Sequence, residues 1–295
     1  MSGTYSEYLR NRAQNCTIHI YDLETGLITD VASFDTVVEA PNWTKDGRYL
    51  IYNSQGKLWR LDLETKEISL IPTGIADTCN NDHVLNPDGT GIAVSSGRND
   101  DSTSRIYTVD FATGEVKCIV SENLSYLHGW SPDGETMAFC AGREHDGEMT
   151  WDIYTVPVQG GPEKRLTDAP GLNDGPEYAP DGSKIWFNSV RSGLMQVYVM
   201  NADGSEQTQM TFGEDRNSWF PHISPDNTKV VYVAYRKDDL EPGQHLPDLN
   251  VEIRMIPAEG GSPKTLVKLF GGQGTMNVNS WSPDSKKFAY VSYRK

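Results

Sequence analysis

A tight-turn motif that repeats six times constrains the fold of this 295-residue chain more than any other feature. Each copy places an aspartate directly after a proline or lysine, and Gly, Asn or Ser follows it; the six are Asp46, Asp88, Asp133, Asp181, Asp226 and Asp284. Successive aspartates are 42 to 58 residues apart, which is the length of one four-stranded propeller blade. The sequence therefore predicts an all-β fold, a six-bladed β-propeller of four-stranded antiparallel blades.

The residues after each turn support this interpretation. Apolar side chains stand four and six positions beyond every aspartate, as in the pairs Leu50 and Tyr52 or Val230 and Tyr232. Alternation with a period of two places both members of a pair on one face of a strand. A third segment and a fourth strand follow in the repeat. The turn between them contains glycine, because glycine supplies the positive φ of a tight reversal.

The two chain ends predict how the ring closes. The last repeat holds only its first two strands, whereas the chain begins with an unpaired third and fourth strand. We expect residues 17–34 to pair with the C-terminal hairpin, so that no long strand edge is left exposed. Residues 16–295 then form one propeller domain, and residues 1–15 form an N-terminal arm, either a short helix or a disordered segment.

Composition excludes several classes of partner. The chain has 26 Lys and Arg against 41 Asp and Glu, a net charge of −15, which disfavours binding to nucleic acid or anionic membranes. No run of 18 apolar residues and no N-terminal secretion signal is present, so we expect no membrane insertion and a cytoplasmic location. The four cysteines show no Cys-x-x-Cys spacing, which favours reduced packing residues.

The repeat resembles a known family. Each unit is similar to the TolB-type β-propeller repeat, and the resemblance covers residues 17–295. The repeat begins with a turn such as Trp-Ser-Pro-Asp-Gly at 130–134. An apolar strand follows, and then an Ile/Val-Tyr-x-Val/Met segment before a glycine turn. More distantly, the chain resembles oligogalacturonate lyases, which bind a metal through histidines at the mouth of the central tunnel. The chain lacks the full histidine and glutamine metal motif of those enzymes, and His222 alone stands just before its turn in the fifth blade.

Histidines gather on one predicted face of the ring. The loops that enter first strands and those that join second to third strands share this face, and five of the six histidines fall there. His83, His128, His222 and Glu177 come from four blades, and imidazole plus carboxylate ligates divalent metals. The prediction is a funnel where these residues bind a ligand or a metal such as Mn²⁺, Zn²⁺ or Ca²⁺; structural histidines are the alternative. The lyase resemblance implies His145 as a catalytic base.

Arginine recurs ten residues after the turn aspartate in five repeats. Of these, Arg143, Arg191 and Arg236 are candidate ligand-binding residues, because a planar guanidinium suits carboxylate or phosphate; pairing with a nearby loop carboxylate is the structural alternative. Trp219 stands outside the repeated aromatic register and is either a stacking surface for a sugar ring or a core residue. A long polar loop over residues 236–249 is expected to fold over the same rim.

These features lead to three hypotheses for function. The first is a TolB-like propeller that binds a small anionic or carbohydrate-like ligand, or a peptide segment, in the funnel. The second is a metal-dependent lyase that acts on acidic sugars at the same funnel. The third is a protein-interaction scaffold. The expected partners are thus a small molecule, an oligosaccharide or a protein.

Overall fold

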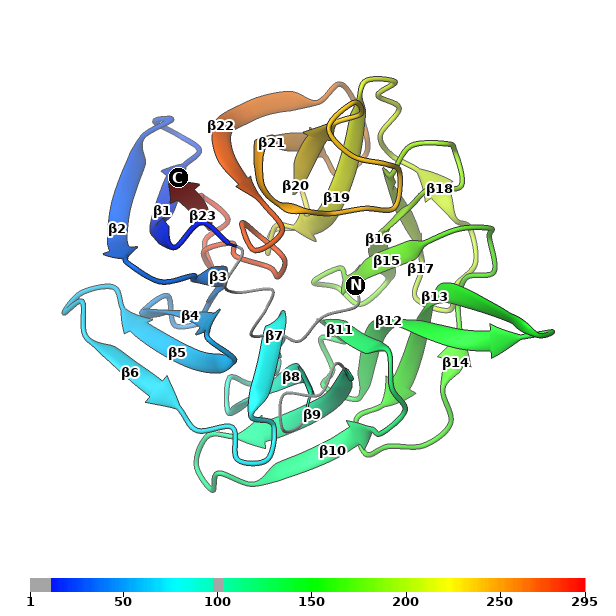
Figure 1. Cartoon of the computed structure of the whole chain (residues 1–295), viewed down its shortest axis with the longest axis horizontal. Coiled ribbons are helices and arrows are strands. Elements are labelled where there is room, and N and C mark those ends of the chain that lie inside the picture. The colour runs from blue at the N-terminus through cyan, green and yellow to red at the C-terminus, as the bar shows by residue number, and fades with distance from the viewer. Residues whose placement is uncertain (1–11, 98–102, 295) are drawn as a thin grey trace.

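The computed structural model of the chain describes residues 12–97 and 103–294, and it shows a ring of six β-sheets around a central axis (Figure 1). Five sheets have four antiparallel strands and one has three. The predicted six-bladed, all-β propeller is therefore confirmed. No helix occurs in these two ranges, and hence no helix that could cross a bilayer.

The blades follow one another along the chain. Blade 1 contains β3 (Glu39–Trp43), β4 (Tyr49–Ser54), β5 (Lys57–Asp62) and β6 (Ile68–Ile71). Blade 2 contains β7 (Thr78–Leu85), β8 (Gly91–Gly97), β9 (Arg105–Asp110) and β10 (Val116–Val120). Blade 3 contains β11 (Ser125–Trp130), β12 (Thr136–His145), β13 (Glu148–Pro157) and β14 (Lys164–Arg165).

The second half of the ring repeats this pattern. Blade 4 contains β15 (Asn173–Tyr178), β16 (Lys184–Ser189), β17 (Gln196–Asn201) and β18 (Thr208–Gln209). Blade 5 contains β19 (Arg216–Ile223), β20 (Lys229–Arg236), β21 (Pro247–Pro257) and β22 (Lys264–Gly272). Strands β3, β7, β11, β15 and β19 are the innermost strands of their blades (Figure 1).

Blade 6 closes the ring as the sequence predicts. β1 (Asn15–Asp22) pairs with β2 (Ile28–Phe34) on one side and with the C-terminal β23 (Lys287–Arg294) on the other. Its innermost segment is not a regular strand, and its one β-bridge to β23 joins Trp281 and Phe288. Further backbone hydrogen bonds hold the segment against β23, as from the Val291 N–H to the Thr275 carbonyl at 3.0 Å, and Asn277 Oδ1 accepts from the Gly274 backbone N–H at 2.6 Å.

Each of the five innermost strands carries a bulge. The register of pairing shifts between Cys79 and His83 in β7, between Leu127 and Gly129 in β11, and between Asp174 and Glu177 in β15, with equivalent shifts in β3 and β19. A bulge inserts an unpaired residue and changes the direction of neighbouring side chains. The site described below is built from residues at these bulges.

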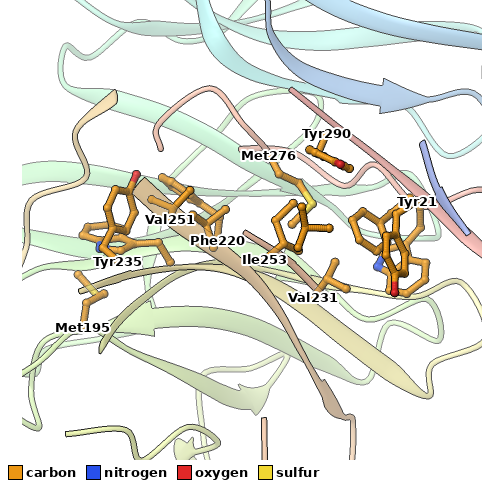
Figure 2. Close-up of a cluster of buried hydrophobic side chains, with 14 of the residues drawn as sticks. Tyr21, Met195, Phe220, Val231, Tyr235, Val251, Ile253, Met276 and Tyr290 are labelled. Carbon is orange, nitrogen blue, oxygen red and sulfur yellow. The ribbon is translucent and has the colours of Figure 1, made fainter. Parts of the chain in front are cut away.

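The hydrophobic core lies between blades as well as within them. One cluster runs from Met195 of blade 4 through Phe220 and Tyr235 of blade 5 to Tyr21 and Tyr290 of blade 6 (Figure 2). The apolar pairs predicted after each turn are all buried, with exposed fractions of 2% or less. The turn aspartates cap their turns, as where Asp181 Oδ1 accepts from the Ser183 backbone N–H at 2.9 Å.

Candidate functional site

Four ionisable side chains from three innermost strands and one loop meet near the axis of the ring. His128 Nε2 of β11 lies 3.3 Å from Asp174 Oδ1 of β15 and 4.0 Å from Asp82 Oδ1 of β7. His245, in the loop between β20 and β21, places its Nε2 4.0 Å from Asp174 Oδ2. We call Asp82, His128, Asp174 and His245 the axial cluster. Three of the four are nearly buried, and His245 is the most exposed, with 23% of its side chain accessible.

Burial and mutual charge set the ionisation of the axial cluster. Burial, reinforced by the charge of Asp174, raises the pKa of Asp82 to about 6 although His128 opposes this. Burial alone would lower the pKa of His128, but Asp82 and Asp174 outweigh it and the pKa is raised. The pKa of Asp174 is lowered because His128 outweighs burial, while burial lowers the pKa of His245. Burial thus makes Asp82 easier to protonate than Asp174, and the two carboxyl groups favour the protonated form of His128.

Aromatic rings line one side of the axial cluster. The ring of Phe220 stacks on His128 at 6.1 Å between centroids and meets His245 edge-on at 5.4 Å. Trp219 packs 4.5 Å from His245 and is fully buried. The loop over residues 237–246 therefore folds back on β19, as its length and polarity predict. Trp219 lies beneath this loop as a core residue and offers no exposed face to a sugar ring.

Glu177 and His222 belong to a separate buried network. His222 Nδ1 lies 2.6 Å from Glu177 Oε2, and His222 Nε2 lies 3.1 Å from the Met276 carbonyl oxygen. Glu177 Oε1 accepts from the Ile223 backbone N–H at 2.9 Å and from Asn279 Nδ2 at 2.6 Å. These contacts join blades 4, 5 and 6, and they engage both imidazole nitrogens with protein oxygens.

The four residues predicted to hold a metal thus lie in three separate places, and only Glu177 and His222 are in contact. His83 is fully buried, and no hydrogen bond of normal geometry reaches either of its ring nitrogens. Burial lowers its pKa to about 4, which the backbone of Ile51 and Ala40 offsets only in part. His128 pairs with Asp174, and His222 with Glu177. Across residues 12–97 and 103–294, no three His, Cys, Asp or Glu side chains are grouped as metal ligands.

The three candidate arginines differ in their surroundings. Arg143 binds Glu163 through two hydrogen bonds of 2.9 and 2.8 Å, and Arg191 donates to the side chains of Ser189, Gln207 and Asn173. Arg143 thus pairs with a loop carboxylate, as the structural alternative predicts, whereas Arg191 is held by neutral side chains of its own blade. Arg236, at the end of β20, is exposed.

His145 lies at the end of β12, in the hairpin that leads to β13. Its Nε2 is 2.8 Å from the hydroxyl of Tyr154 in the same blade, and none of its described hydrogen bonds or ion pairs reaches the axial cluster. The structure therefore places the predicted catalytic base apart from His128 and Asp174.

A second ionic group lies at the first described residue. The guanidinium of Arg12 contacts Glu39 at 2.5 Å and Asp248 at 3.4 Å, and it stands 4.5 Å from the centre of the Tyr293 ring. Arg12 falls within the predicted arm at 1–15, and Asn15 already belongs to β1; residues 1–11 lie outside the described residues. Part of the predicted arm is thus docked on the propeller.

Sequence reasoning found His128 but missed the roles of Asp82, Asp174 and Arg12. Asp82 and Asp174 stand one and three positions before the predicted residues His83 and Glu177, and an alternating strand pattern assigns residues an odd number of positions apart to opposite faces. The bulges override that alternation. The available signal was an aspartate three to eight residues before a turn motif in two repeats.

The relatives of the chain agree with this architecture. The sequence profile described as the TolB beta propeller domain matches residues 128–252. An uncharacterised protein of Agrobacterium fabrum is 42% identical over 94% of this chain and 92% of its own length. The solved structure of a TolB candidate from Agrobacterium tumefaciens is 41% identical, covers 95% of this chain and 99% of its own, and superimposes with a TM-score of 0.88.

More distant relatives have lower sequence identity to this chain. The Tol-Pal system protein TolB of Francisella tularensis is 26% identical over 84% of this chain, which spans 55% of that protein's length. An oligogalacturonate lyase in complex with manganese is 14% identical, with a TM-score of 0.55 over 95% of this chain and 91% of its own, and this likeness concerns the fold alone. The chain belongs to the family of TolB-like β-propellers.

Proposed function

We propose that this propeller is a protein-interaction module that binds a segment of a partner protein at the axial cluster, and that the segment presents a cationic side chain to Asp174. The observation that carries the proposal is the convergence of Asp82, His128, Asp174 and His245 from three blades and one loop, with 3.3 Å between His128 and Asp174. Convergence of partly buried charges at one place is typical of a recognition site.

The charge of the axial cluster decides the class of ligand. Two carboxyl groups, Asp82 and Asp174, stand here against His128, while burial lowers the pKa of His245 and so favours its neutral ring. The whole chain also carries a net charge of −15, which attracts basic segments over a distance. A uronate or another anionic ligand would meet like charge here, so a basic peptide segment fits better than the acidic sugar expected from the lyase resemblance.

The aromatic lining suits such a segment. Phe220 lies against both His128 and His245, and it offers an apolar surface beside the carboxylate of Asp174. Lysine and arginine bury their aliphatic stems on apolar surface while the charged head reaches a carboxylate. The TolB name of the matching domain, and of a relative in the Tol-Pal system, accords with binding to protein.

The chemistry of a lyase has less support. Its predicted metal ligands are divided among the axial cluster, the Glu177–His222 network and the buried His83. A metal would have to displace the Met276 carbonyl or Glu177 from His222, and it would have to reach a histidine that is fully enclosed. We therefore do not propose the metal-dependent reaction.

Selection of peptides from a phage-displayed random heptapeptide library on the full chain tests the proposal. The expected result is enrichment of sequences with lysine or arginine, and loss of that enrichment when the same library is selected on Asp174→Asn. Asp181→Asn is the matched control, since Asp181 belongs to the same blade and its carboxylate binds Ser183 and Asn227, with no described contact to the axial cluster. Enrichment of acidic or uncharged sequences, or equal enrichment on Asp174→Asn, would contradict the proposal.

A further inference from the structure

We infer that the segment bound at the axial cluster also carries an apolar side chain, and that this side chain packs on one face of the hairpin between β12 and β13. The surface that receives it consists of Leu124, Tyr126, Met149 and Trp151, and we call it the hairpin patch. This assignment rests on the function proposed above, because the cationic side chain of the same segment is the one that reaches Asp174.

The hairpin patch lies on a single face of blade 3. Tyr126 of β11 stands opposite Cys140 of β12. Gly142, two positions further along β12, stands opposite Trp151 of β13. Residues two apart lie on the same face of a strand, so these four positions share one face of the blade. The rings of Tyr126 and Trp151 accordingly lie 6.1 Å apart, measured between their centroids.

Three side chains of the patch converge over Gly142. A Cβ atom at this position would lie 3.2 Å from Leu124, 3.2 Å from Trp151 and 3.3 Å from Met149. Their apolar atoms therefore form one continuous surface. Met149 is 56% exposed, and Leu124, Tyr126 and Trp151 are partly exposed. A contiguous apolar surface that remains open to solvent, with a flexible methionine in it, is typical of a protein-binding site.

Tyr126 connects the hairpin patch to the axial cluster. It stands two residues before His128 on β11. Cys140, opposite Tyr126, donates through Sγ to the backbone carbonyl of the residue before Asp174, at 3.3 Å. Burial and then the charges of Asp82 and Asp174 raise the pKa of Tyr126 to about 12, which agrees with a position beside these carboxyl groups. The apolar surface thus begins where the axial cluster ends.

The tip of the hairpin is acidic and suits a basic segment. Glu144, Asp146 and Glu148 are all exposed, and Glu144 stands opposite Met149, on the face of the hairpin patch. Arg143 lies on the other face of β12, where side chains of its own blade bind it. The carboxylates beyond the patch therefore attract the same class of segment as the axial cluster does.

The geometry also sets the spacing within the bound segment. Two positions of β11 separate Tyr126 from His128, and the ring of Trp151 lies 6.1 Å beyond that of Tyr126. An extended chain rises about 3.3 Å per residue, so the apolar residue should stand about two to four residues from the cationic one. The segment is therefore expected to combine a basic residue with an apolar residue at a short, fixed distance.

Selection from a phage-displayed nonapeptide library with lysine fixed at the centre tests the inference. The wild type is expected to enrich leucine, methionine or an aromatic residue about two to four positions from that lysine. Met149→Ser is expected to lose this enrichment while the protein stays folded, since Met149 is 56% exposed. Leu70→Ser is the matched control, because Leu70 is 50% exposed on the outer strand of blade 1, and it should select as the wild type does.

Calorimetry with one selected nonapeptide measures the size of the effect. Serine in place of its apolar residue should weaken binding roughly 5-fold in the wild type and in Leu70→Ser, but less than about 2-fold in Met149→Ser. Glutamine in place of its central lysine should weaken binding to all three proteins. Binding that does not depend on the lysine would contradict the proposed function together with the inference that rests on it. Lysine-dependent binding with no apolar preference, or with an equal preference in Met149→Ser, would overturn the hairpin patch alone.

Discussion

His128 Nε2 lies 3.3 Å from Asp174 Oδ1, so the innermost strands of two neighbouring blades share a buried ion pair. The pair places charged groups on the innermost strands of blades 3 and 4. Asp82 on one side and His245 on the other extend it into a cluster with an excess of negative charge. Blade packing fixes the positions of these four side chains, and their charges are the basis of the proposed preference for a cation.

Asp82 makes the stability of the fold depend on pH in a direction opposite to that of most aspartates. Its pKa is about 6 in the folded protein against an ordinary 3.8, so between pH 4 and 6 the folded chain keeps a proton that the unfolded chain has lost. Stability contributed by this group therefore falls as the pH rises through that window. In Asp82→Asn the decline should vanish, and the variant should gain about 2 kcal/mol relative to the wild type from pH 4 to pH 6.

Urea denaturation at half-unit steps of pH measures this difference. Asp88→Asn in the same blade is the control, because hydrogen bonds from Thr90 lower the pKa of Asp88, and its contribution is lost only as the pH falls below about 4. Parallel curves for Asp82→Asn and the wild type would show that Asp82 does not titrate in this way.

Glu177 should contribute strongly to the stability of the ring, because its buried carboxylate joins three blades. Its carboxylate accepts three hydrogen bonds from blades 5 and 6, including the one from His222 at 2.6 Å. Loss of one partner in a buried ion pair costs about 3 to 5 kcal/mol. Glu177→Gln should therefore lower the free energy of unfolding by about 3 kcal/mol.

Glu163→Gln is the matched control for that measurement, since Glu163 pairs with Arg143 at a partly exposed position, where the expected loss is about 1 kcal/mol or less. Chemical denaturation of both variants under the same conditions measures the two losses in the free energy of unfolding. Equal losses for the two substitutions would mean that the Glu177 network does not join the blades.

Much of this architecture could be predicted from the sequence, and particular residues show why. The turn aspartates and the apolar pairs such as Leu50 and Tyr52 are local signals with fixed spacing, so blade number and strand faces followed directly. The closure of β1 on β23 followed from counting strands at the two ends.

The site was less accessible to prediction because it depends on contacts between blades. Nothing in the segment around His222 indicates that its partner is Glu177, 45 residues earlier. Bulges moved Asp82 and Asp174 to the axis against the alternating pattern. Trp219 stands outside the repeated aromatic pattern, so the repeat gave no indication of its burial. The structure shows it fully buried and packed against His245 of the loop between β20 and β21.

Arg143 should matter for stability and not for recognition. Its guanidinium is bound by Glu163, the Asn123 carbonyl and the Ser125 hydroxyl. Arg143→Ala should lower the free energy of unfolding by about 1 to 3 kcal/mol, the cost of leaving buried acceptors without their charged donor. The affinity for a basic heptapeptide should stay the same as in the wild type, and a marked loss of affinity at unchanged fold would place Arg143 in the binding site.

The affinity of a selected basic heptapeptide for the wild type and for Asp174→Asn, measured by calorimetry beside Asp181→Asn, tests the axial cluster most directly. A hydrogen bond to a charged group contributes about 1.5 to 3 kcal/mol, so Asp174→Asn should weaken binding by roughly 10-fold to 100-fold while Asp181→Asn leaves it unchanged. Equal affinities for all three proteins would contradict recognition of a cation by Asp174.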